Sequence, residues 1–309
     1  EAQAVKCLRQ NFIFALFAMK GKDMKLGLCT TDLLPNTVDL IFKNLQQLGC
    51  EVVQLSFASF LETNFIPDGK IEIPMDVSPT ILDEIGEKSE KYSVKIKVIN
   101  GTFNMSHPDK SVRLEGIKRM ENLIKISHEL GCKIVSLCSG TRNSENLWAG
   151  HSQNQSDAAW YDMSETIKFA LEKAEKHSIC LALESEAANI VDSPQKARRL
   201  LDQMESGNLK IIMDCANLFH EGFAKKENVR PTMRQAFEYV GEDIIVAHGK
   251  DIKESSKIEF CAAGEGIVDF PYFISLLKNF GYKGDMYLHG AESEREVEQS
   301  VLFMKKVMR

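Results

Sequence analysis

The chain has no long apolar segment and no block of basic residues. Within its 309 residues, no uninterrupted apolar run approaches the roughly 20 residues that a membrane-spanning helix needs. The 38 Lys and Arg residues are outnumbered by 44 Asp and Glu residues, which gives a formal net charge of −6. A chain of this charge attracts nucleic acid poorly. We therefore expect no membrane partner, no nucleic-acid partner, and a small polar molecule as the ligand.

The sequence also lacks a C-x-x-C pair, although it contains 8 cysteines. Several of them, Cys29 and Cys180 among them, lie in short apolar runs. Disulfide frameworks are typical of short secreted domains, and a chain of this length does not need one. We expect reduced thiols in the core of a cytoplasmic protein.

The first 23 residues do not share the pattern of the rest of the chain. The apolar run 12–19 is too short for a signal peptide and has no small-residue cleavage site after it. A natural start at Met24 fits this pattern. We expect residues 1–23 to be an N-terminal extension, either artificial or a helix that covers apolar surface, and residues 24–309 to form a single domain.

From residue 25 onward, short apolar runs alternate with amphipathic segments. The predicted strands are 25–29, 51–57, 94–100, 133–138, 179–184, 209–214, 244–248 and 285–289. The predicted helices are 37–48, 78–91, 112–130, 158–176, 193–204, 231–240, 270–280 and 294–307. Eight alternating pairs imply parallel strands that close into a barrel. An open doubly wound sheet is less favoured because no G-x-G-x-x-G follows the first strand. The prediction is an α/β protein with a (β/α)8 TIM barrel.

The last four predicted strands each end on a side chain that can bind a metal or transfer a proton. These residues are Glu184, Asp214, His248 and His289. A carboxylate or imidazole at the end of a buried strand is unfavourable unless it is bonded. In a barrel, the carboxyl ends of the strands meet at the face that carries the active site. Two carboxylates and two imidazoles suit Mn²⁺, Zn²⁺, Fe²⁺ or Co²⁺ better than Ca²⁺.

Each of these residues has an ordinary structural alternative. Glu184 could form a salt bridge, Asp214 could cap the following loop, and His248 could be a core histidine with satisfied hydrogen bonds. The shared position at strand ends favours one common site instead. His289 is the weakest member, because Glu292 could supply an oxygen ligand in its place.

Several short motifs lie at the ends of the predicted strands: Leu183-Glu184, Met213-Asp214 with Asn217, Ala247-His248-Gly249-Lys250-Asp251 and Ala263-Gly264-Glu265-Gly266. Their order and spacing resemble those of the xylose-isomerase-like barrel superfamily. More narrowly, the chain resembles the sugar phosphate isomerase/epimerase proteins, which include ketose 3-epimerases and hydroxypyruvate isomerases. The resemblance runs from Met24 to the C-terminus.

The resemblance implies a divalent metal, often Mn²⁺, held by Glu, Asp, His and a second Glu. It also implies that the two glutamates move protons on opposite faces of a bound sugar. By position, Glu184 is then a ligand and the base, and Asp214 and His248 are ligands. His289 stands where the epimerases have the second glutamate, and Asn217 where a histidine is common. The two-glutamate mechanism therefore does not transfer unchanged. Mn²⁺ is the expected cofactor, with Zn²⁺, Fe²⁺, Co²⁺ or Mg²⁺ as alternatives.

Polar residues in the loops are candidates for substrate binding. They are Asn104, His107, Arg142, Trp148, Asn217 and Lys250. Arg142 could hold a carboxylate or phosphate through two hydrogen bonds, and Trp148 could stack on a sugar face. Lys250 could neutralise an anionic intermediate or pair with Asp251. His151 lies among polar residues and is expected to be solvated. Packing of the loops is the alternative for the whole set.

The loop 263–266 bears on phosphate recognition. Gly264 and Gly266 would let the backbone approach a ligand where barrels commonly bind phosphate. Glu265 between them would oppose a phosphate, so an unphosphorylated sugar or keto-acid derivative is expected.

The sequence thus predicts an enzyme, a metal-dependent isomerase or epimerase of a small sugar or hydroxy-keto substrate. Glu184 would remove a proton next to a carbonyl, and His289 or a water molecule would return it. The alternatives are a lyase acting on a keto-sugar or glycoside at the same site, and a non-catalytic sugar-binding barrel that lost the second glutamate. An endonuclease-like phosphodiesterase is disfavoured, because only 7 histidines are present. A homo-oligomer is compatible with the sequence.

Overall fold

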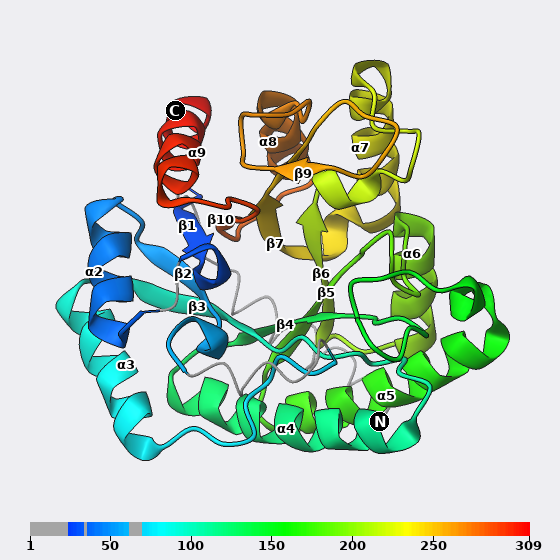
Figure 1. Cartoon of the computed structure of the whole chain (residues 1–309), viewed down its shortest axis with the longest axis horizontal. Coiled ribbons are helices and arrows are strands. Elements are labelled where there is room, and N and C mark those ends of the chain that lie inside the picture. Colours follow the sequence, from blue (N-terminus) through cyan, green and yellow to red (C-terminus); the bar gives the residue numbers. More distant parts are fainter. Residues whose placement is uncertain (1–23, 34–35, 62–69) are drawn as a thin grey trace.

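The computed structural model describes residues 24–33, 36–61 and 70–309, so the predicted N-terminal extension lies outside the described residues. Eight parallel strands form a closed barrel in which neighbours follow the order of the chain, and the last strand pairs with the first. Figure 1 shows the helices arranged as a ring around these strands. The predicted (β/α)8 barrel is confirmed.

Every predicted strand and helix of the barrel is present. The barrel strands are β1 (Leu26–Cys29), β2 (Val52–Leu55), β3 (Lys95–Asn100), β4 (Ile134–Cys138), β5 (Cys180–Glu184), β6 (Leu209–Asp214), β7 (Ile244–Gly249) and β10 (Met286–Leu288). The helices are α2 (Val38–Gln47), α3 (Pro79–Lys91), α4 (Lys110–Glu129), α5 (Asp157–Lys176), α6 (Pro194–Met204), α7 (Lys226–Val240), α8 (Phe270–Asn279) and α9 (Glu294–Val307). Two short strands outside the barrel, β8 (Asp251–Ile252) and β9 (Phe260–Cys261), pair antiparallel in the segment between β7 and α8 and were not predicted.

Helix α7 was predicted to begin at Pro231, but it begins at Lys226. The prediction was based on the preference of proline for the first helical position. Here Pro231 lies inside the helix, where it removes one backbone hydrogen bond. Val229 precedes the proline and is buried with Met233 and Phe237 on one face, so burial of this apolar face extends the helix toward its N-terminus.

Two apolar clusters fill the molecule. The larger one lies between the strands and the surrounding helices and includes buried residues of every helix. The smaller one contains side chains from seven barrel strands: Cys29, Val52, Val98, Ala182, Ile212, Ile245, Val246 and Tyr287. Barrel interiors are filled by such layers of strand residues. We assign the smaller cluster to the barrel interior, directly below the strand ends.

Two further observations concern the cysteines and the helices of the described residues. All seven of their cysteines are free thiols, and six of these are buried. No helix in the described part of the chain is both long enough and apolar enough to cross a membrane.

Candidate active site

Strand periodicity explains why the four predicted residues meet. Alternate residues of a strand face the same side of a sheet. Ala182 and Ile212 belong to the interior cluster, so Glu184 and Asp214, each two positions later, also face the barrel axis. His248 follows Val246 in the same way. His289 follows Tyr287 by two positions. It was predicted to end the strand, but it lies just past the end of β10.

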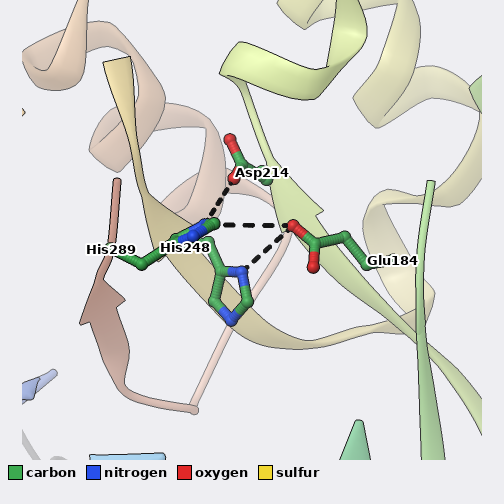
Figure 2. Close-up of side chains that lie close together, drawn as sticks. All are labelled: Glu184, Asp214, His248 and His289. Carbon is green, nitrogen blue, oxygen red and sulfur yellow. Dashed lines mark hydrogen bonds and ion pairs between the residues drawn. The ribbon is translucent and has the colours of Figure 1, made fainter. Parts of the chain in front are cut away.

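The four side chains point toward one another at the carboxyl end of the barrel (Figure 2). Nδ1 of His248 lies 3.1 Å from Oε1 of Glu184, and Nε2 of His289 lies 2.8 Å from Oδ2 of Asp214. Nε2 of His289 is also 4.0 Å from Oε1 of Glu184. One potential ligand atom from each residue lies within 4.8 Å of the other three.

This group of atoms has the size and chemistry of a divalent metal site. A metal with ligand bonds of about 2.1 Å separates its ligand atoms by at most about 4.2 Å, so only small shifts are needed. Imidazole nitrogens and carboxylate oxygens together suit Mn²⁺, Zn²⁺ or Fe²⁺. Glu292, the alternative fourth ligand, is exposed and is not in the group. The position of His289 therefore favours it over Glu292, and the ligand role of all four residues stays a prediction.

Gln54 orients the ring of His248. Nε2 of His248 lies 2.9 Å from Oε1 of Gln54, an acceptor, so Nε2 donates a hydrogen bond to it. The other ring nitrogen, Nδ1, then faces Glu184. A hydrogen bond of this kind commonly orients a histidine that binds metal through its other nitrogen. Gln54 was not predicted, although it follows the interior residue Val52 by two positions on β2.

Asp214 is the most strongly stabilised anion of the site. Its side chain is fully buried, and Oδ1 accepts the backbone N–H of Ala216 at 2.8 Å. Nζ of Lys250 lies 3.4 Å from Oδ2. Burial raises the pKa of Asp214, but the charges of Lys250 and His289 outweigh it and hold this pKa well below its ordinary value. Burial and Lys250 lower the pKa of His289, and Asp214 and Glu184 raise it overall.

Asn217 links two glutamates. Its Nδ2 donates to Oε1 of Glu184 at 2.9 Å and to Oε1 of Glu186 at 2.7 Å. Burial would raise the pKa of Glu184, but the charge and hydrogen bond of His248 keep it below its ordinary value. Burial raises the pKa of Glu186 to about 7. Glu186 was missed in the sequence, where its only signal was its position two residues after Glu184.

A cavity of about 750 Å³ opens above this group. Glu184, His248 and His289 lie among its lining residues, together with Lys250 and Trp148. The indole Nε1 of Trp148 donates to Oε1 of Glu72 at 3.2 Å, and Nδ2 of Asn100 donates to the other oxygen of Glu72 at 3.2 Å. The predicted candidates Trp148 and Lys250 therefore lie at the cavity, and Glu72 was not predicted.

The sequence matches the family described as xylose isomerase-like TIM barrel over residues 42–307. This match covers most of the barrel, including the four converging residues. The chain belongs to the xylose isomerase-like TIM barrel family.

The chain is also similar to named proteins and to solved structures. L-ribulose-5-phosphate 3-epimerase UlaE of Escherichia coli is 23% identical over 182 residues, which cover 59% of this chain and 58% of UlaE. The chain thus spans about three fifths of the curated relatives that it matches. A D-tagatose 3-epimerase-like protein has a TM-score of 0.71 at 18% identity, covering 92% of this chain and 97% of its own. The IOLI protein with a bound zinc atom has a TM-score of 0.68 at 17% identity, covering 92% and 96%. At these identities, the two structures support the fold.

In this member of the xylose isomerase-like family, four of the six predicted substrate-binding residues do not line the cavity. One of them, Asn217, binds Glu184 and Glu186, and the other three, Asn104, His107 and Arg142, lie in the loops. Asn104 is buried, and its Oδ1 accepts the backbone N–H of Thr141 at 2.9 Å. Nε2 of His107 lies 3.0 Å from the carbonyl of Ser144. These bonds hold the loops after β3 and β4 together, so the loop-packing alternative describes both residues better.

Arg142 is likewise occupied by the protein itself. Its guanidinium donates to the Ser106 carbonyl at 3.0 Å and to Oδ2 of Asp162 at 2.7 Å. Arg113 binds the other oxygen of Asp162 at 3.0 Å. The structure gives no support to a substrate role for Arg142. His151 is exposed, as expected.

Asp251 explains the two glycines of the predicted ligand-binding loop. Its carboxylate accepts four backbone N–H groups, from Ile252 and Val268 at Oδ1 and from Gly264 and Gly266 at Oδ2, all at 2.9–3.0 Å. A Cβ atom on Gly266 would lie 2.3 Å from Oδ1 of Asp251. The close approach expected for a ligand is thus made by a side chain of the protein, and Glu265 is exposed outside the cavity.

Proposed function

We propose that this protein is a divalent-metal-dependent isomerase or epimerase of a small sugar. One observation carries the proposal: Glu184, Asp214, His248 and His289 bring their ligand atoms within 4.8 Å of one another, and all but Asp214 line the cavity. The carboxyl end of the strands is where barrel enzymes have their active sites. The epimerase relative in E. coli gives independent support for a sugar as the substrate.

A divalent ion held by these residues would supply positive charge that acidifies the C–H bond next to a coordinated carbonyl. The protein's own contribution begins with Glu184. Its pKa lies below the ordinary value, so its carboxylate is ionised at neutral pH and able to accept a proton. The hydrogen bonds from Asn217 and His248 fix the position of Oε1, and Glu184 lines the cavity.

His289 is our candidate for returning the proton. It lies 2.8 Å from Asp214, which raises its pKa, so the imidazole carries a proton more readily than a free histidine. The same Nε2 atom cannot bind a metal and donate a proton at one time. If His289 returns the proton, the ion would be held by Glu184, Asp214 and His248.

The proposal is tested by hydrogen exchange on candidate sugars. The protein is loaded with Mn²⁺ and incubated in D2O with D-tagatose, L-ribulose or D-fructose, and proton NMR follows the C–H groups next to the carbonyl. We expect exchange together with an epimer or isomer, and about one metal ion per chain by elemental analysis. An eliminated product would indicate a lyase, and binding without exchange would indicate a sugar-binding barrel.

The variant Glu184→Gln should retain the fold by circular dichroism and lose exchange, because an amide cannot accept the proton. Glu292→Gln is the matched control, since Glu292 is exposed and outside the site. Full exchange activity in Glu184→Gln would exclude Glu184 as the base.

A further inference from the structure

We infer that the substrate is an unphosphorylated ketose or keto-sugar, and that the site discriminates against phosphate esters. The inference rests on the proposed function, because it names the substrate class of the same cavity. A ketose phosphate carries its phosphate at the end of the sugar chain that is remote from the carbonyl. Recognition of the phosphate therefore depends on groups outside the four converging residues.

A phosphate site needs free backbone N–H groups or cationic side chains. Barrels commonly bind phosphate with the loops that follow their seventh and eighth strands. N–H groups at such loops and at helix N-termini, together with Arg and Lys, provide the hydrogen bonds. In this protein the corresponding loops follow β7 and β10.

The N–H groups of the loop after β7 are occupied by a carboxylate of the chain itself. Those of Gly264, Gly266 and Val268 all donate to Asp251, at 2.9–3.0 Å. Asp251 is 1% exposed and cannot give up these bonds without leaving a buried carboxylate unsatisfied. The loop thus has the cluster of N–H groups that an anion site needs, but the carboxylate of Asp251 already occupies it.

Two N–H groups of the loop after β10 also donate to carboxylates of the protein. The N–H of Ala291 donates to Oδ2 of Asp32 at 2.8 Å, and the N–H of Glu292 donates to Oε2 of Glu296 at 2.7 Å. The first turn of α9 also contains Glu294. These carboxylates use the positive end of the helix dipole and would repel a phosphate placed there.

The cavity wall adds acids rather than free cations. Among the described residues that line it there is no arginine, and Lys250 is bound to Asp214 at 3.4 Å. Nε2 of His220 lies 3.1 Å from the Asp192 carbonyl. The carboxylates on the wall are those of Glu72, Glu184, Glu186 and Glu221.

The same wall suits the hydroxyl groups of a sugar. Carboxylate oxygens accept hydrogen bonds from hydroxyls, and Nδ2 of Asn100 has a second N–H besides the one that it donates to Glu72. Glu72 holds the indole of Trp148 by its N–H, which fixes an aromatic surface at the cavity. Hydroxyl acceptors beside an aromatic face are a suitable lining for an uncharged polyol.

Matched sugar pairs test the inference. The Mn²⁺-loaded protein is titrated with L-ribulose, D-fructose and D-tagatose and with their terminal phosphate esters, and tryptophan fluorescence reports binding. Trp148→Phe identifies the signal of the cavity, because the other tryptophan, Trp160, lies on α5. We expect each unphosphorylated sugar to bind at least ten-fold more tightly than its ester.

The inference is overturned if a phosphate ester is the tightest ligand of the panel, or if no unphosphorylated sugar binds. The hydrogen-exchange experiment tests the proposed function independently of this binding result. Preferred exchange of an ester would support the proposed function while overturning the substrate class. Selective binding of the free sugar without exchange would do the reverse.

A charge-reversal variant tests the physical cause. Glu221→Lys places an ammonium in the cavity wall and should reduce the preference for the free sugar at least five-fold. Glu265→Lys makes the same change on the exposed loop outside the cavity and should leave the ratio unchanged. An equal effect of both variants would assign the selectivity to overall charge and overturn the local explanation.

Discussion

Nζ of Lys250 lies 3.4 Å from Oδ2 of Asp214, whereas the neighbouring Asp251 binds backbone N–H groups of the loop before α8. Lys250 follows His248 by two positions, so both side chains face the cavity. Asp251, one residue later, points to the other side. The sequence left open a pair between Lys250 and Asp251. Instead, Lys250 binds a residue of the site, and Asp251 binds the loop before α8.

Replacing Lys250 should make the protein dependent on metal for its stability. In Lys250→Met, the buried Asp214 loses its cationic neighbour, which should lower the free energy of unfolding of the metal-free protein by about 3–5 kcal/mol. A divalent ion can replace the lost charge. Mn²⁺ should therefore raise the thermal midpoint of Lys250→Met more than that of the unmodified protein.

The matched control is Lys253→Met, because Lys253 is exposed. Scanning calorimetry with EDTA and with Mn²⁺ gives the two increments. Equal increments in Lys250→Met and in the unmodified protein would contradict a metal bound beside Asp214.

Asp251 should control the order of the loop after β7. An asparagine has one oxygen in place of two, so Asp251→Asn leaves two of the four N–H groups without an acceptor. We expect a loss of about 2–4 kcal/mol in the free energy of unfolding. Amide exchange of Gly264, Gly266 and Val268 should become faster. Glu265→Gln, an exposed change in the same loop, should alter neither quantity, and unchanged exchange in Asp251→Asn would refute the role of its carboxylate.

Periodicity accounts for how far the sequence predicted this molecule. Alternation within a strand is a local property, so Glu184, Asp214 and His248 could be placed on one face, and barrel closure brought them together. The same rule, applied to β2, would have found Gln54. No comparable rule exists for Arg142, because its partner Asp162 lies on α5 and the loop between them has no repeat. Loop residues are fixed by tertiary contacts that the sequence does not encode locally.

Asp243 should contribute an acid-sensitive part of the stability. Its carboxylate pairs with Lys210 at 2.6 Å and with Arg198 at 2.8 Å. Burial raises the pKa of Asp243, but these two cations outweigh it and lower the pKa below its ordinary value. A lowered folded-state pKa gives stability that is complete above the unfolded value of about 3.9 and is lost as pH falls through the folded value.

Asp243→Asn should therefore reduce the free energy of unfolding by about 1 kcal/mol at pH 7, and by less at pH 2–3. Urea unfolding across this pH range measures the difference. Asp202→Asn is the control, since Asp202 binds only Arg198 among the described residues and is 65% exposed. A difference for Asp243→Asn that does not shrink toward low pH would show that the ion pairs are not its cause.

Substitutions of His289 distinguish its two possible roles, metal binding and return of the proton. If it only binds metal, His289→Gln should weaken Mn²⁺ binding at least ten-fold, and saturating Mn²⁺ should restore the exchange rate. If it returns the proton, exchange by Glu184 should persist while formation of the epimer or isomer falls 10²–10⁴-fold at any Mn²⁺ concentration. His289→Glu provides the decisive comparison, because a carboxylate can both bind the ion and accept or donate a proton. Recovery of product formation in His289→Glu but not in His289→Gln would assign proton transfer to this position. Unchanged product formation in His289→Gln would remove His289 from the catalytic residues and leave the return of the proton to water.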